Sequence, residues 1–137
     1  MNKSLLFVIP FGLIVIGCGG DSVQSGSESG KATKVIPVAT PDLLPVFDDP
    51  VMQTGRAIWI QKCGKCHFRG KAGSPKTLDK EEWKNRIATK GRDTLLKHTI
   101  HGFETLSTEM PARGGFEELT DAELIAAVDY IIKISTN

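Results

Sequence analysis

The stretch "QKCGKCHFRG", residues 61–70, holds two of the chain's three cysteines and one of its three histidines. Cys63 and Cys66 are separated by two residues, and His67 follows the second cysteine directly. A Cys-x-x-Cys pair occurs in redox dithiols, in one half of many zinc sites and in the covalent attachment of haem. The rest of the chain has to distinguish these three chemistries.

The composition indicates one small folded domain with additional segments, since the chain has 137 residues of which 40% are hydrophobic and 24% charged. The formal net charge of +1 gives no general basis for binding nucleic acid or a membrane surface. The charge is unevenly distributed, because residues 51–97 carry 12 Lys/Arg against 4 Asp/Glu and residues 98–137 carry 2 against 7. The basic part of the domain therefore surrounds the cysteine pair.

The N-terminus, residues 1–22, reads "MNKSLLFVIPFGLIVIGCGGDS". Its apolar run is shorter than the roughly 20 residues that span a bilayer, and it suits the core of a secretory signal. The sequence "VIGC", which ends at Cys18, resembles the lipobox of bacterial lipoproteins. We expect removal of residues 1–17, lipidation of Cys18 and anchoring to a bacterial membrane with the domain on the periplasmic side. An ordinary signal peptide and a buried helix are the alternatives.

Residues 18–50 are predicted to form the lipidated N-terminus and a tether. Glycine and serine are frequent in residues 19–34, and residues 35–50 contain four prolines. Such a composition cannot bury a core, so the segment is expected to be flexible at first and stiffer near the domain. The folded domain is expected to cover residues 51–137.

The domain reads as helical throughout. Asp49 and Pro50 suit the N-cap and first position of a helix that runs to about Lys62. A second helix is expected to begin at Asp79 and to end at Gly91.

Residues 93–101 suit a third, short helix, and Thr120 with Glu123 forms a capping box for the last one. The last helix places four apolar residues on one face, Leu124, Ala127, Val128 and Ile131. No stretch alternates as a half-buried strand would, so the prediction is an all-α domain of four to five short helices.

The three chemistries can now be compared. A thioredoxin-type dithiol is expected within a βαβ pattern, which this sequence lacks. A structural zinc site needs four ligands, and His98 and His101 do not continue Cys63 and Cys66 in a typical finger layout. Cys-x-x-Cys-His is the attachment signature of haem c. We therefore predict one covalent haem, with thioether bonds to Cys63 and Cys66 and with His67 as an axial ligand of the iron.

The second axial ligand is predicted to be Met110, in the sequence "TEMPARGGF". Proline and glycine indicate a loop there, and Pro111 stiffens it directly after the methionine. His98 and His101 are alternatives, and Met52 lies on the first predicted helix.

Residues 51–137 resemble a class I c-type cytochrome, and in particular the cytochrome c5 branch. The first helix of that family has a glycine, an aromatic residue and Cys-x-x-Cys-His at the spacing found in residues 55–67. "MPARGG" (residues 110–115) is similar to the methionine loop of the branch, and "LTDAELIAAVDYI" (residues 119–131) to its C-terminal helix.

The resemblance implies a small fold whose helices wrap around one haem, with the last helix crossing the first near Gly55. It implies that the carbonyl of Pro75 accepts a hydrogen bond from the axial imidazole. Arg86 would face the haem propionates or would simply be an exposed charge. Trp83 would line the haem pocket or belong to the core.

An iron with both axial positions filled suits electron transfer and leaves no site for a substrate. We therefore expect an electron carrier that is not an enzyme and that binds neither a small-molecule substrate nor nucleic acid. A haem subunit of a multi-subunit dehydrogenase or reductase is the alternative. Basic residues near the attachment site are expected to steer redox proteins with acidic docking surfaces: Lys62, Lys65, Arg69, Lys71 and Lys76.

Overall fold

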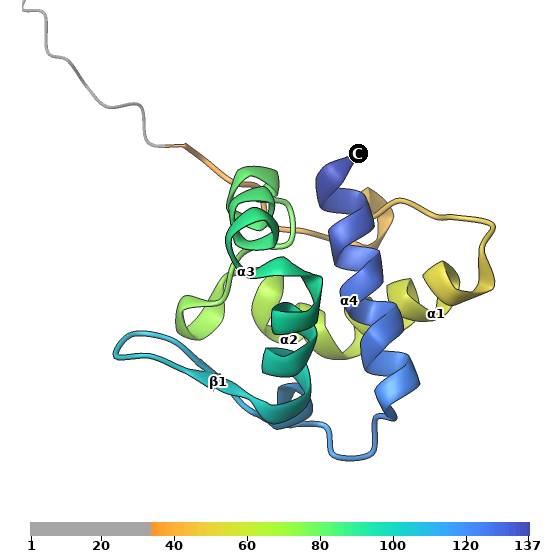
Figure 1. Ribbon diagram of the computed structural model, residues 1–137. Coiled ribbons are helices and arrows are strands. Elements are labelled where there is room, and N and C mark those ends of the chain that lie inside the picture. The colour runs from red at the N-terminus through yellow and green to blue at the C-terminus, as the bar shows by residue number, and fades with distance from the viewer. Residues whose placement is uncertain (1–33) are drawn as a thin grey trace, which may run out of the picture. The chain divides into compact units, whose positions relative to one another are not determined.

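The computed structural model describes residues 34–137, so the predicted signal sequence and Cys18 lie outside the described residues. The described chain is mostly helical, as expected, and carries one small hairpin (Figure 1). Its elements are η1 (Pro41–Leu43), α1 (Pro50–Ile58), η2 (Trp59–Cys63), α2 (Gly64–His67), η3 (Lys71–Gly73), α3 (Lys80–His101), β1 (Phe103–Glu104), β2 (Glu109–Met110), η4 (Ala112–Gly115) and α4 (Asp121–Thr136).

The first helical stretch is longer than predicted. Asp49 caps it by accepting the backbone N–H of Met52 at 2.9 Å, and Pro50 occupies the first turn. The backbone then continues from α1 through the π-helical turn η2 into α2, which ends at His67. A π turn changes the direction of the side chains that follow it, and such turns are frequent at functional sites. Both cysteines and the histidine therefore lie on one continuous helical stretch.

The two helices expected on either side of Gly91 are the two segments of α3. Asp79 caps the first segment by accepting the N–H of Glu82 at 3.3 Å. Gly91 interrupts the helix with φ 76° and ψ 162°, a backbone conformation that favours glycine. The antiparallel hairpin β1–β2 follows and pairs Phe103 with Met110. Its strands have two residues each, too few to produce an alternating pattern in the sequence.

Helix α4 packs against both α1 and α3. Thr120 and Glu123 form the predicted capping box, with both hydrogen bonds present. A Cβ atom placed on Gly55 would lie 2.1 Å from the carbonyl oxygen of Ala126. The backbones of α1 and α4 are therefore in contact at this crossing, where only glycine fits, as the resemblance implied.

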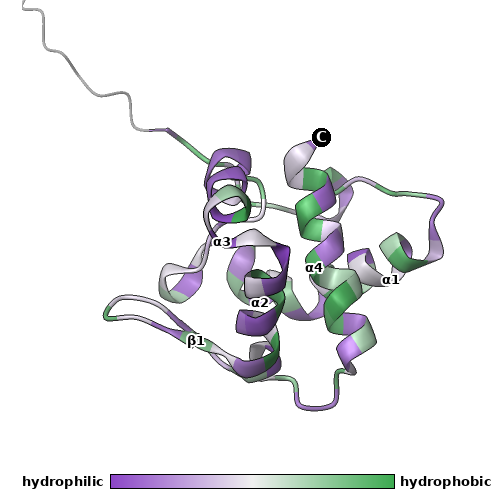
Figure 2. Ribbon diagram, viewed as in Figure 1, coloured by the Kyte–Doolittle hydropathy of each residue, from purple (hydrophilic) through white to green (hydrophobic). Residues whose placement is uncertain are grey.

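The core lies on the inner face of α4. Figure 2 shows α4 as the most apolar helix, whereas the first segment of α3 is largely polar. Leu124, Ala127 and Ile131 are 1–2% exposed and pack in one cluster with Trp59 and Trp83.

The segment before α1 differs from the prediction. Residues 34–49, named here the N-terminal strap, belong to the same compact unit as the helices. Leu44 is 3% exposed and is part of the core. The Tyr130 hydroxyl donates to the carbonyl of Pro45 at 2.8 Å, and Arg56 donates to the carbonyl of Pro41 at 2.6 Å. Backbone acceptors and several apolar side chains, Leu44 among them, hold this proline-rich segment on the domain, so the compact unit begins at Lys34 rather than residue 51.

No helix within residues 34–137 is both long enough and apolar enough to cross a membrane.

Replacing Gly55 with alanine should destabilise the fold by about 3 kcal/mol, because the added methyl group would force apart two backbones that are in contact. Urea unfolding followed by circular dichroism measures the change. The exposed Thr54→Ala on the same helix is the control, with an expected change within about 0.5 kcal/mol. Equal stabilities for the two variants would contradict the close helix crossing.

Candidate haem-binding site

A cavity opens among α2, the second segment of α3, the hairpin and α4, with about 1230 Å³ of empty space including the part that is open to solvent. Cys63, Cys66 and His67 line it, and so does Met110 from β2. The structure thus brings the predicted attachment residues and the predicted second ligand to one site.

His67 is held in a defined orientation. Its side chain is 8% exposed, and its Nδ1 lies 2.9 Å from the carbonyl oxygen of Pro75. Because a carbonyl can only accept, Nδ1 carries the proton and Nε2 keeps its lone pair. The ring packs against Trp59 and Trp83, with centroid distances of 5.2 Å and 5.7 Å. This is the arrangement in which an imidazole can ligate a metal through Nε2.

The protonation state of His67 agrees with this role. Burial lowers the pKa of His67, the hydrogen bond to Pro75 opposes that shift, and the charge of Arg86 adds to it. The ring is therefore neutral at pH 7, and the neutral imidazole is the form that binds metals.

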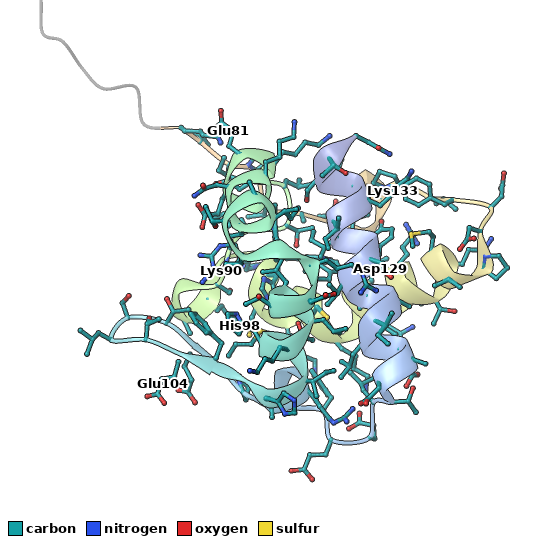
Figure 3. All side chains as sticks on the ribbon, in the orientation of Figure 1. Glu81, Lys90, His98, Glu104, Asp129 and Lys133 are labelled. Atoms are coloured by element: carbon teal, nitrogen blue, oxygen red, sulfur yellow. The ribbon has the colours of Figure 1, made fainter. Side chains whose placement is uncertain are left out.

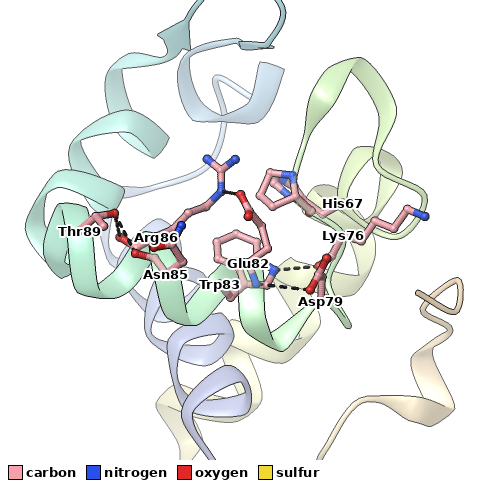
Figure 4. A network of polar contacts seen from close by, with 9 residues as sticks. His67, Lys76, Asp79, Glu82, Trp83, Asn85, Arg86 and Thr89 are labelled. Carbon is pink, nitrogen blue, oxygen red and sulfur yellow. Dashed lines mark hydrogen bonds and ion pairs between the residues drawn. The ribbon is translucent and has the colours of Figure 1, made fainter. Parts of the chain in front are cut away.

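The segment that carries Pro75 is fixed by the two tryptophans. The Trp59 indole N–H donates to the hydroxyl of Thr77 at 3.1 Å. The Trp83 indole N–H donates to the carbonyl of Lys76 at 2.9 Å (Figure 4). The N–H of Thr77 also donates to the carbonyl of His67 at 2.8 Å. Trp83 thus belongs to both the cavity wall and the core, and the sequence had not indicated the role of Thr77.

The two thiols differ in exposure, since Cys63 is partly buried and Cys66 is exposed. Burial raises the pKa of the Cys63 thiol to about 12. An attacking redox cysteine needs the opposite shift, because the thiolate is the reactive form. The environment of Cys63 therefore disfavours a thioredoxin-type dithiol. Within residues 34–137, no three side chains of the His, Cys, Asp and Glu types gather as a metal cluster would require.

The alternative candidates for the second axial ligand differ from one another in whether they line the cavity. His98 also lines the cavity, and its ring stacks on Phe103 with centroids 4.3 Å apart. Figure 3 shows His98 on the last part of α3, close to the hairpin. His101 does not line the cavity, and Met52 packs against the core elsewhere. Met110 and His98 are the two candidates that remain in reach of the cavity.

The hairpin closes against the loop that precedes Pro75. Gly73 has a φ of 72°, and a Cβ atom there would lie 2.7 Å from the Thr108 hydroxyl oxygen. Ser74 and Thr108, on the two sides of this contact, both line the cavity. We call the contact between Gly73 and Thr108 the rim contact, since it joins the loop before Pro75 to the hairpin before Met110.

Arg86 lines the cavity from α3 and is paired with Glu82, one turn earlier (Figure 4). Its Nε donates to the Glu82 carboxylate at 2.6 Å, and within residues 34–137 no other group accepts a hydrogen bond from it. The remaining N–H groups are available to a ligand of the cavity.

The five predicted docking residues do not all lie at the cavity. Lys62 and Lys65 line the cavity, and the Nζ atoms of both lie 4.7 Å from the ring centroid of Phe116. Lys62 also pairs with Glu118 at 2.7 Å, and this hydrogen bond lowers the pKa of Glu118. The other three, which do not line the cavity, are Arg69, Lys71 and Lys76. The charge at the cavity is therefore partly neutralised.

Known proteins with similar sequences indicate the family of this chain. The family model described as "Cytochrome C oxidase, cbb3-type, subunit III" matches residues 50–131, more than half of the chain. A cytochrome c-555 of Chlorobaculum tepidum is 41% identical over 78 residues, which cover 57% of this chain and 71% of the relative. The cytochromes c-555 of Chlorobaculum thiosulfatiphilum and Prosthecochloris aestuarii are 38% and 32% identical, with 57% and 59% of this chain and 90% and 85% of the relatives covered.

The chain belongs to this family of c-type cytochromes, as a monohaem class I member. Its cofactor is therefore one covalent haem c, and it is an electron carrier rather than an enzyme. An extracytoplasmic location goes with the family. The N-terminal strap lies entirely before the matched residues, since the family model begins at residue 50.

The cavity of this cytochrome fits the cofactor, because an exposed thiol, a partly buried thiol and an oriented neutral imidazole meet apolar walls. The inner face of α4 supplies part of these walls, as its helical period predicted. Other wall residues gave no signal in the sequence, because they follow the Gly91 kink or lie in the hairpin: Leu95, Thr99, Phe103 and Thr108.

Replacing Thr77 with valine should destabilise the haem-loaded cytochrome by about 1–3 kcal/mol, because the buried indole N–H of Trp59 would lose its acceptor. Guanidinium unfolding measures the difference. Thr89→Val removes an exposed hydroxyl that bonds only within its own helix and should change stability by less than about 0.5 kcal/mol. A Thr77→Val variant as stable as Thr89→Val would refute the role assigned to this hydrogen bond.

Proposed function

We propose that this cytochrome carries single electrons between redox proteins outside the cytoplasm while tethered to a membrane. Cys63 and Cys66 would hold the haem through thioether bonds, and His67 and Met110 would ligate its iron. The observation that supports these roles most directly is that all four side chains line one cavity. When bound, the haem supplies a reversible one-electron change at its iron.

The chain's own task is to hold the two axial ligands and to limit water at the site. Pro75 keeps the His67 ring oriented, and Trp83 packs on that ring. Arg86 would compensate the charge of the haem propionates with the N–H groups that Glu82 does not engage. Filling both axial positions leaves no place for a substrate, and methionine ligation in a buried site favours the ferrous state.

The membrane tether rests on the sequence around Cys18. A lipidated N-terminus would keep the cytochrome at the bilayer. Because the strap belongs to the folded unit, it would not contribute to the tether that the sequence predicts for residues 18–50.

The proposed partners are redox proteins with acidic docking surfaces. Lys62 and Lys65 lie at the cavity itself, whereas Arg69, Lys71 and Lys76 follow on the next segment of the chain. Positive charge beside the haem-binding cavity would speed the encounter with an acidic partner, and salt would weaken the effect. Contacts of this kind are typically small, below about 1,200 Å² of buried surface.

A second candidate function is that of a haem subunit in a larger complex. The description of the matched family as subunit III of an oxidase favours it. The cytochrome c-555 relatives favour a separate carrier, since the matched segment alone makes up 71–90% of their length. Purification in mild detergent distinguishes the two functions. Co-purification of a large partner protein would support the role of a haem subunit.

Replacing Met110 with alanine should abolish the far-red absorption band that sulfur coordination gives to the ferric protein, because the proposed sulfur ligand is removed. The opened iron should also bind carbon monoxide promptly in the ferrous state. His98→Ala is the matched control, since it removes the other candidate on the cavity wall and should leave the band intact. A band that survives in Met110→Ala would assign the ligand to another residue.

Replacing Glu118 with glutamine should raise the rate of oxidation by ferricyanide roughly twofold to fivefold at low salt, because Lys62 would lose its neutralising partner. Stopped-flow absorbance measures the rate, and the gain should shrink as salt is added. Asp42→Asn makes the same change of net charge on the strap and should have a smaller effect. Equal gains in both variants would mean that only net charge matters.

A further inference from the structure

The loop after Met110 contains a residue in an unfavourable backbone conformation. Arg113 has φ 54° and ψ 22°, in the left-handed region where a Cβ atom is crowded. The next two residues, Gly114 and Gly115, also have positive φ values, of 65° and 81°, but glycine adopts them freely. Backbone strain of this kind persists only where the surrounding contacts compensate for it.

The side chain of Arg113 makes the compensating contacts. Its Nη1 donates to the carbonyl of Leu119 at 2.6 Å, and its Nη2 donates to the carboxylate of Asp121 at 2.5 Å. Leu119 is 5% exposed, and Asp121 is the first residue of α4. The two donors of one planar guanidinium therefore connect the methionine loop to the start of the helix that forms the cavity wall.

The other side of the loop is also confined. A Cβ atom on Gly102 would lie 3.0 Å from both the carbonyl oxygen of Met110 and the N–H nitrogen of Ala112. Pro111 restricts the backbone between them, and its carbonyl accepts the N–H of Gly114 at 2.9 Å. The short segment from Met110 to Ala112 is thus held between Gly102 and the contacts of Arg113.

We infer that Arg113 is the positioning residue of the methionine loop, and that its two contacts, with the Leu119 carbonyl and with Asp121 at the start of α4, keep the Met110 thioether at the iron. The inference rests on the proposed ligation by Met110. Arg113 also lines the cavity, so its side chain lies directly beside the site that it would shape. A residue that supported only the fold would alter unfolding without altering how readily the sulfur leaves the iron.

The test compares two arginine pairs in the haem-loaded full chain. Arg92 makes a similar pair, because its Nε and Nη2 donate to the Asp129 carboxylate at 2.5 Å and 2.9 Å. This pair joins α3 to α4, and Arg92 does not line the cavity. The variants Arg113→Gln and Arg92→Gln therefore each remove one arginine–aspartate pair, with only the first pair touching the methionine loop.

The measurement is the rate at which added imidazole displaces the sulfur ligand of the ferric iron, followed by loss of the far-red band. Arg113→Gln should react roughly tenfold faster than the wild type, since two charge-assisted hydrogen bonds that restrain the loop are lost. Arg92→Gln should stay within about twofold of the wild type. Urea unfolding of the same variants reports their general stability.

Glutamine keeps the strained backbone at residue 113, so Arg113→Gly provides a second variant. Glycine relieves the strain and also removes the contacts with Leu119 and Asp121. The inference expects faster displacement in this variant too, even if its unfolding midpoint equals that of the wild type. Displacement at the wild-type rate in a stable Arg113→Gly would overturn it.

Failure of the inference differs from failure of the proposed ligation. If Met110→Ala loses the far-red band but both Arg113 variants behave as Arg92→Gln does, the ligand is right and the positioning role is wrong. If Met110→Ala keeps the band, the ligation and the positioning role are both wrong.

Discussion

The contact between Gly55 and the carbonyl of Ala126 is the constraint on which the rest of the structure depends. Two helix backbones touch there, so the angle and register of α1 against α4 are fixed. Because η2 and α2 continue α1, the same contact sets where Cys63 and His67 face the apolar side of α4. Gly55 does not line the cavity, yet it thus sets where the predicted attachment residues meet the cavity wall.

The two sides of the pocket are built by different means. His67 lies on a helix, and its ring is fixed by Pro75 and by two tryptophans that are hydrogen-bonded in turn. Met110 lies on a two-residue strand followed by a turn with positive φ values. Regular structure therefore holds one side rigidly, while the other depends on glycine, proline and the contacts of a single arginine. In an electron carrier both sides have to hold their ligands in place, because the site must change little between oxidation states.

Sequence reasoning worked best where a local pattern has one physical cause. The Cys-x-x-Cys-His signature, the caps at Asp49 and Thr120 and the break at Gly91 all depend on neighbouring residues, and the structure shows these caps and the break as expected. The strap and the pairing of Lys62 with Glu118 join residues through tertiary contacts, which no local pattern encodes. The proline-rich composition predicted a tether for this segment, because composition alone does not show that Leu44 packs into the core.

The rim contact joins the two sides of the pocket without involving either proposed ligand. A Cβ atom on Gly73 would clash with the Thr108 hydroxyl, and Ser74 and Thr108 beside this contact line the cavity. Reduction potentials of haem sites depend on solvent access and local polarity as well as on the axial residues. A larger residue at position 73 would have to displace the Thr108 hydroxyl, and a resulting change in solvent access would alter the reduction potential while both proposed ligands stay in place.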